Sequence, residues 1–158
     1  MLAEENFPMS DTTQNPSHAP AGYNSVQPYL MFVNAAEAIA FYAKAFGATE
    51  KLRMNSPEGR IVHAEIVIGN SVIMLADENP AVEAFAPPHY KGSPVSLMVY
   101  VESSDATYQT ALDAGATSLR EPADQPYGDR MAGILDPFGY KWWIAHSLNN
   151  DAERGLNQ

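Results

Sequence analysis

The stretch RIVHAEIVIG, residues 60–69, shows how the chain gives the two faces of one predicted strand different chemistry. Side chains alternate along a strand, and one face of this strand is entirely apolar. Its members are Val62, Ala64, Ile66 and Ile68. The opposite face carries His63 and Glu65, so an imidazole and a carboxylate point in the same direction. We therefore expect one face to pack in a core and the other to line a surface where a polar pair can act.

The composition is that of a globular protein without disulfides. The chain has 158 residues, 46% of them hydrophobic, which suits one domain or two small halves with a shared core. No run approaches the roughly 20 apolar residues of a membrane helix. The N-terminus lacks the basic and apolar regions of a secretory signal. Cysteine is absent, which excludes thiolate zinc sites and cysteine nucleophiles and fits a reducing cytoplasm.

The charge argues against two classes of partner. Nine Lys and Arg residues stand against 19 Asp and Glu residues, for a formal net charge of −10. Such a surface repels nucleic acid and anionic membranes, so we expect neither as a partner. The acidity fits plain solubility, and it also fits a cationic ligand.

Two successive segments share the same predicted order of one strand, one helix and three strands. The first covers residues 23–77 and the second residues 95–147, joined by a Pro-rich linker at 78–94. The letters FGAT at 46–49 return as AGAT at 114–117, 68 residues later. A repeated order of elements indicates an internal duplication. We therefore expect one domain built from two similar modules.

Both predicted helices carry signals at their ends. In the helix predicted for 34–47, Asn34 can cap the first turn and Gly47 can adopt the left-handed conformation that ends it. Glu37 stands three residues after Asn34, as in a capping box. The second helix is predicted for 103–115. The predicted strands cover 25–33, 49–54, 60–68, 71–77, 93–101, 117–120, 130–135 and 140–146.

The segments outside the domain have a different composition. Residues 1–22 mix Pro, Ser, Thr, Asn and acidic residues without a hydrophobic period, which predicts a flexible tail. Residues 151–158 are predicted as a second tail, which leaves 23–150 as the domain.

The strand faces opposite the predicted helices carry aromatic, Met and polar side chains at matching positions. The first strand of each module contributes three of them, 69 residues apart, and the last strand adds an indole. They are Gln27, Tyr29 and Met31, then Ser96, Met98 and Tyr100, and finally Trp143. A concave wall with scattered polar groups is typical of small-molecule sites. We therefore expect a ligand-binding cup between the halves, with a dimer interface or a wet surface as the alternatives.

Three further residues could act at such a cup. Arg130, in the run YGDR after the turn at Gly128, could bind an anion at the rim or form a surface pair with an Asp. His63 and Glu65 form a candidate acid–base pair, and Tyr100 could polarise a carbonyl group. Proton transfer on a small carbonyl compound is the metal-free reaction that these residues could support.

Three motifs resemble one superfamily. They are VQPYLMFVNAAEAIAFYAKAFGA, VHAEIVIGNSVIMLAD and YGDRMAGILDPFGYKWWIAHS. Residues 23–147 thereby resemble the vicinal oxygen chelate superfamily, which includes glyoxalase I, bleomycin-resistance proteins and extradiol dioxygenases, and most closely its PhnB-like branch. The resemblance implies an α+β fold in which two βαβββ modules form a cup-shaped curved mixed sheet with the helices outside. It also implies a homodimer.

The resemblance further implies four metal-ligand positions, one on each of four strands. They fall on Gln27, Glu65, Ser96 and Trp143. Serine is a poor ligand and tryptophan is none, whereas useful sites generally need three or more protein ligands. We therefore expect no cofactor. A divalent metal, if bound, would use Gln27, His63 and Glu65.

These observations predict a cytoplasmic, dimeric small-molecule-binding protein with a degraded metal site. Its aromatic-lined cup would suit an aromatic or cationic ligand, because ring faces attract both. One alternative is a metal-dependent lyase, isomerase or dioxygenase of the same fold with His63 and Glu65 in catalysis. Another is a non-catalytic dimeric interaction module whose cup is closed.

Overall fold

The computed structural model describes residues 18–149, and the sections of the predicted tails at 1–17 and 150–158 lie outside them. Within this range the chain forms two four-stranded mixed sheets, each with one long helix. The predicted α+β class and the two βαβββ modules are confirmed. The strands form two separate four-stranded sheets, one in each module, and these sheets do not close into a barrel.

The first module has the strand order β1-β4-β3-β2, with β1 parallel to β4 and the other pairs antiparallel. Its helix begins after the cap Asn34, whose side chain accepts the Glu37 amide, and ends at Gly47 in the left-handed conformation, as predicted. Its elements are β1 Tyr29–Phe32, α1 Ala35–Phe46, β2 Thr49–Asn55, β3 Ile61–Ile68 and β4 Ser71–Asp77.

The second module repeats this arrangement as β5-β8-β7-β6. Ser103 caps its helix by accepting the Ala106 amide. Its elements are β5 Ser96–Tyr100, α3 Ser104–Asp113, β6 Thr117–Asp124, β7 Asp129–Leu135 and β8 Lys141–Ser147. Between the modules the linker forms a 3-10 turn, η1 Pro80–Val82, and the short helix α2 Pro87–Tyr90.

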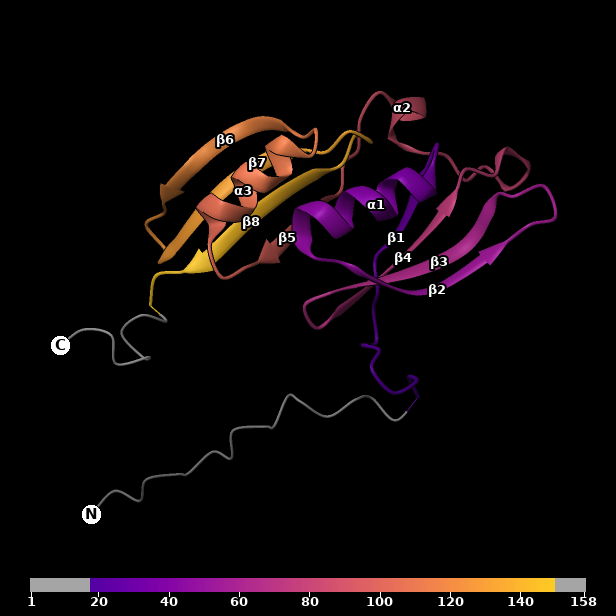
Figure 1. The fold of residues 1–158 in the computed structure, drawn as a ribbon, viewed down its shortest axis with the longest axis horizontal. Helices are drawn as coiled ribbons and strands as arrows, with labels where there is room; N and C mark the ends of the chain where they lie inside the picture. The colour runs from indigo at the N-terminus through magenta and orange to yellow at the C-terminus, as the bar shows by residue number, and fades with distance from the viewer. Residues whose placement is uncertain (1–17, 150–158) are drawn as a thin grey trace, which may run out of the picture.

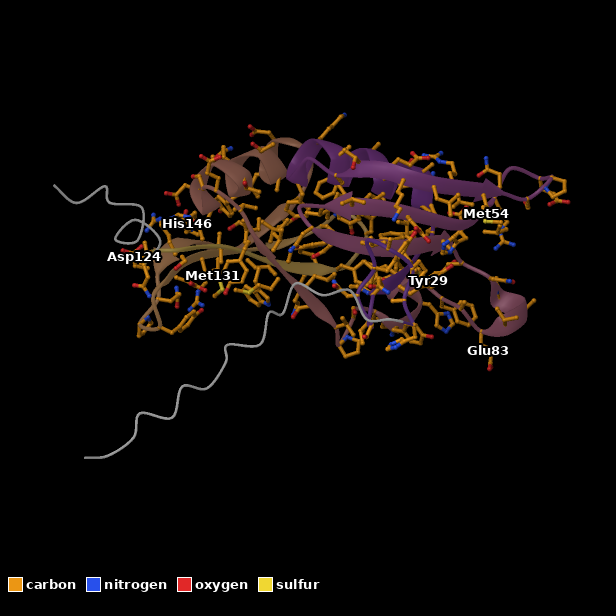
Figure 2. The ribbon with its side chains drawn as sticks, turned by 90° about the horizontal axis from the view of Figure 1, so that it is seen from below. Tyr29, Met54, Glu83, Asp124, Met131 and His146 are labelled. Atoms are coloured by element: carbon orange, nitrogen blue, oxygen red, sulfur yellow. The ribbon has the colours of Figure 1, made fainter. Side chains whose placement is uncertain are left out.

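The two sheets lie side by side, and α1 and α3 contact each other on one side of them (Figure 1). The core lies between these helices and the sheets, as the apolar strand faces predict. Its largest fully buried side chains include Phe32, Tyr42, Ile66, Leu75 and Trp142. The opposite sides of the sheets, here called the outer faces, carry neither α1 nor α3, and Figure 2 shows Tyr29 and Met131 on them.

A buried carboxylate joins the modules. Asp136, 3% exposed, lies in the turn between β7 and β8 and accepts hydrogen bonds from Tyr42 of α1 at 2.5 Å and from the Trp142 indole at 3.0 Å. It also accepts the backbone amides of Phe138 and Tyr140, both at 2.9 Å. This full set of donors satisfies the buried charge. Burial, as the largest influence, nevertheless raises the pKa of Asp136.

The first strand is shorter than predicted. Residues 25–33 were expected to be extended, but β1 begins only at Tyr29 because Pro28 has no amide for a ladder and the preceding residues turn. Val26, in the part that was expected to be extended, is 81% exposed. In residues 18–149, no helix combines the length and the apolarity that crossing a bilayer requires.

Candidate functional site

Strand register aligns the two outer faces residue by residue. In each module one row of side chains crosses the middle of the outer face, from the first strand to the edge strand. In the first module this row is Tyr29, Met74, Glu65 and Leu52. In the second it is Met98, Trp143, Gly133 and Arg120. Glu65 therefore corresponds to Gly133, and Trp143 corresponds to Met74.

A hydrogen-bonded chain runs from the buried Glu65 to the surface. One carboxylate oxygen lies 3.0 Å from His63 Nε2, and the other accepts the Tyr23 hydroxyl. His63 Nδ1 lies 2.7 Å from the Tyr29 hydroxyl. With Glu65 ionised and His63 neutral, Nε2 donates to the carboxylate and Nδ1 accepts the Tyr29 proton. The chain leads from a side chain that is 5% exposed to one that is 46% exposed.

Opposing influences act on the pKa of Glu65, and related influences act on the pKa of Tyr29. Burial alone would raise the pKa of Glu65, but hydrogen bonds from Tyr23 and His63 and the charge of Lys51 lower it, and the net direction is downward. Burial and the Glu65 charge raise the pKa of Tyr29. At neutral pH the chain therefore holds a carboxylate at one end and an intact phenol at the other.

The segment before β1 covers this carboxylate. Tyr23 places its hydroxyl on Glu65 while the Lys51 ammonium lies 3.8 Å from the centre of the Tyr23 ring. Gln27 lies in the same segment, and its side-chain oxygen accepts the Asn24 amide at 2.7 Å. Gln27 thus stabilises the turn that carries Tyr23.

On the second outer face an aromatic ring occupies the central position. A Cβ atom on Gly133 would lie 2.5 Å from Cζ3 of Trp143, so the indole rests directly on the glycine backbone. The Trp143 indole N–H donates to Ser96 Oγ at 3.3 Å. Tyr100 donates to Asp129 at 2.9 Å and is 65% exposed, and Met98 is 44% exposed. These residues form the predicted aromatic wall on this module.

The single chain holds the predicted residues in two groups on different sheets. Glu65, His63 and Tyr29 form one group, and Ser96 and Trp143 form the other. Across residues 18–149, no hydrogen bond, ion pair or ring contact joins the two. A cavity of about 290 Å³ does lie between the modules. Its lining residues are Asn24, Val26, Pro28, the turn 68–73, Leu97–Tyr100 and Trp142.

Met31 belongs to the first outer face but borders a different hollow. With Tyr29, Arg60 and Ala76 it lines a cavity of about 220 Å³, to which Val82 of η1 also contributes. This hollow adjoins the exposed end of the Glu65–His63–Tyr29 chain.

Arg130 lies on the helix side of the second sheet and is paired with two acidic side chains. Its guanidinium contacts Asp105 at 3.0 Å and Asp124 at 2.9 Å, beside the first turn of α3. Asp129 faces outward to Tyr100, and since side chains alternate, Arg130 points to the helix side of β7. The Arg–Asp pair that the sequence offered as the alternative is therefore present, and an anion at Arg130 would have to compete with two carboxylates.

The four positions that the superfamily uses for a metal do not fit one in this chain. The oxygens of Glu65 are bonded to Tyr23 and His63, and Gln27 is bonded to a backbone amide. Trp143 offers only an N–H donor. For the part of the chain described, no three side chains among His, Asp and Glu gather closely enough to hold a metal ion.

Sequence reasoning missed three residues of these surfaces. Gly133, inside a predicted strand, carried a readable signal, since an internal glycine often marks a close approach. Tyr23 and Lys51 carried none, because the contact with Glu65 depends on how the segment before β1 turns back.

Comparisons with known proteins agree with this fold. The model of the glyoxalase/bleomycin resistance protein/dioxygenase superfamily matches residues 25–144. An uncharacterized protein of Mycobacterium bovis is 39% identical over 127 residues, which cover 78% of this chain and 84% of that protein.

Two solved structures share the fold at low sequence identity. TioX from Micromonospora sp. ML1 has a TM-score of 0.61 at 21% identity, covering 77% of this chain and 94% of TioX. A Bacillus cereus protein described as PhnB has a TM-score of 0.60 at 20% identity, covering 78% of this chain and 100% of its own. With a family model that matches most of its length, the chain belongs to the glyoxalase/bleomycin resistance protein/dioxygenase superfamily.

Proposed function

We propose that the protein binds a small aromatic or cationic molecule on its outer faces without a metal ion. One observation carries this proposal: large apolar and aromatic side chains stay exposed on both outer faces, and the first of these faces also holds a buried carboxylate. Tyr29, Met98 and Tyr100 are 46%, 44% and 65% exposed. Exposed apolar patches of this kind commonly mark interaction sites. Glu65 supplies a negative charge near rings that can stack on a planar or cationic ligand.

Tryptophan fluorescence tests this proposal with an internal control. Trp142 is 1% exposed in the core, whereas Trp143 lies on the outer face. A panel of aromatic and cationic compounds should quench the wild-type protein and leave Trp143→Phe unaffected. Equal quenching of both proteins would show a non-specific effect, and no response to any compound would favour the closed interaction module.

We propose further that the ligand-binding unit is a homodimer. The single chain leaves the Glu65 group and the Trp143 group on different sheets, so a second copy could place the first outer face of one chain against the second of its partner. Such an arrangement would also cover Tyr100 and Met98. Light scattering coupled to gel filtration should give twice the mass of the chain, and a monomer at micromolar concentration would contradict the dimer.

A second candidate function is metal-independent proton transfer on a small carbonyl compound. The Tyr29–His63–Glu65 chain favours it, because a carboxylate that orients an imidazole is a common acid–base arrangement. Exchange of carbon-bound protons of hydroxyacetone in deuterated water, followed by NMR, should accelerate with the wild-type protein. His63→Ala should abolish the acceleration, and an unchanged exchange rate would remove this candidate.

We also propose that the protein is cytoplasmic and lies on the PhnB-like branch of the superfamily. The motif DPFGYKWW at 136–143 supports the branch, as does the likeness to the Bacillus cereus PhnB protein.

A further inference from the structure

Tyr23 belongs to a segment that lies across the first outer face, here called the N-terminal strap, residues 18–28. The strap contains no helix or strand and is mostly exposed. A turn closed by the Tyr23 amide on Pro20 at 3.1 Å shapes it, with Gly22 at φ +86°. The Asn24–Gln27 bond holds its second half. The strap therefore has no regular secondary structure, and its one tyrosine makes specific contacts with the first module.

Each part of the Tyr23 side chain meets a complementary group. The hydroxyl donates to a carboxylate oxygen of Glu65, and the ring face carries the Lys51 ammonium at 3.8 Å. A charged acceptor makes a strong partner for a phenolic proton, and a cation over the ring adds electrostatic attraction. Glu65 itself is 5% exposed and is held in place by His63. These are the elements of a binding site for a phenol.

The occupant of this site is only loosely tethered. If the strap opened, Glu65 would keep the His63 bond but lose its second donor, and Lys51 would lose its aromatic partner. Segments with little regular structure open at a lower free-energy cost than core strands. An external molecule that offers the same hydroxyl and ring could take the vacated place.

We infer that Glu65 and Lys51 form a phenol-binding subsite that Tyr23 occupies as an internal ligand, and that an external phenolic ring displaces the strap. This subsite rests on the proposed function, in which the first outer face takes a ligand. It narrows the ligand to aromatic compounds with a hydroxyl group. Because Tyr23 is part of the same chain, its effective concentration is high, and only a ligand with additional contacts would compete well.

Chemical complementation tests the inference with 4-methylphenol, which is the tyrosine side chain as a free molecule. Calorimetry should show that Tyr23→Ala binds 4-methylphenol about tenfold more tightly than the wild-type protein does, since the internal competitor is gone. Toluene, which lacks the hydroxyl, should bind Tyr23→Ala about tenfold more weakly than 4-methylphenol, because a hydrogen bond to a charged acceptor is lost. Adding Glu65→Gln to Tyr23→Ala should reduce this difference, because the amide oxygen is an uncharged and weaker acceptor.

Matched variants guard against loss of folding. Tyr23→Phe keeps the ring but not the hydroxyl, so it should bind 4-methylphenol more tightly than the wild-type protein even if Tyr23→Ala does not fold. Tyr90→Ala removes an exposed tyrosine from α2 and should behave like the wild-type protein. The subsite would be overturned if wild type, Tyr23→Phe and Tyr23→Ala bound 4-methylphenol with equal affinity. It would also be overturned if Tyr23→Ala bound toluene as tightly as 4-methylphenol.

The outcome separates this inference from the proposed function. Wild-type protein that responds to the fluorescence panel, with Tyr23→Ala that ignores 4-methylphenol, would remove the subsite alone. A silent panel together with strong binding of 4-methylphenol to Tyr23→Ala would keep the subsite and remove the wider aromatic wall.

Discussion

At the centre of the first outer face stands a carboxylate, and at the same position of the second stands a glycine. Glu65 is covered by a tyrosine from the strap, whereas Gly133 is covered by the indole of its own neighbouring strand. Both centres are closed by an aromatic ring. The first is polar beneath the ring and the second is bare backbone, so only the first can offer a charge to a ligand.

This difference shows which features of the module the duplication keeps. Strand order, the parallel pairing of the first and last strands and the capped helix recur in both halves. Core packing constrains these features because buried side chains interdigitate closely. The outer rows differ, since the first module has an acid at its centre and the second a glycine beneath an aromatic ring.

The largest effect is expected at the second centre. Gly133→Ala would place a methyl group 2.5 Å from Trp143 and force the ring to move. Overpacking of this kind should lower the free energy of unfolding by about 1–3 kcal/mol, measured by urea denaturation. In a Trp143→Ala background the same substitution should cost much less, and an equal cost in both backgrounds would show that the indole does not rest on Gly133.

Removing the charge at the first centre should cost less. Glu65→Gln keeps the shape of the side chain but weakens the bonds to Tyr23 and His63, which should lower the free energy of unfolding by about 1 kcal/mol at pH 7. Thermal unfolding of both proteins measures this value. A loss of several kcal/mol would identify Glu65 as a structural residue.

Glu65→Gln should also weaken the dependence of the free energy of unfolding on pH in the acidic range. The pKa of Glu65 is lowered in the folded state, so its stabilisation is present above the ordinary value of 4.5 and is lost as the pH falls toward the folded-state pKa. The raised pKa of Asp136 acts in the opposite direction, so the difference between wild type and Glu65→Gln is the quantity to follow. That difference should shrink below pH 4.5, and a constant difference would contradict the assignment.

A smaller effect is expected where the cation meets the strap. Lys51→Met removes the ammonium above Tyr23 but keeps a long apolar side chain, and should cost about 0.5 kcal/mol, as for an exposed cation–π pair. Hydrogen exchange at the Asn24 amide should accelerate because the strap opens more often. An unchanged exchange rate would mean that Lys51 does not hold the strap.

The smallest effect on binding is expected at Arg130. Arg130→Gln breaks the pairs with Asp105 and Asp124 on the helix side of β7, away from both outer faces. The fluorescence response to the ligand panel should match that of the wild-type protein. A weaker fluorescence response of Arg130→Gln would show that Arg130 contributes to ligand binding.

Local pattern was enough to predict the modules. The alternation in 60–69 identified the inward and outward faces of β3 from His63 onward, and the caps at Asn34 and Gly47 marked the ends of α1. Before His63 the prediction is wrong, because a register irregularity buries Ile61 and leaves Val62 44% exposed. Such features depend on neighbours within a few residues. The same alternation, applied between Asp129 and Arg130, could also have placed Arg130 on the helix side.

Other features depend on contacts between distant segments. Tyr23 lies 42 residues from Glu65, and no periodicity connects them. The separation of the sheets likewise depends on how α1 and α3 pack, which strand patterns do not report. The sequence therefore predicted on which face of its strand each candidate ligand-binding residue lies. It did not predict that these residues form two groups on different sheets.

The adjacent indoles of Trp142 and Trp143 allow the most direct test of ligand binding on the outer face. The Trp142 N–H donates to the buried Asp136, and the Trp143 N–H donates to Ser96 on the outer face. In a two-dimensional ¹⁵N–¹H NMR titration with a quenching compound, the Trp143 indole signal should shift while the Trp142 signal stays in place. A shift of Trp142 alone, or of neither signal under saturating ligand, would contradict the account.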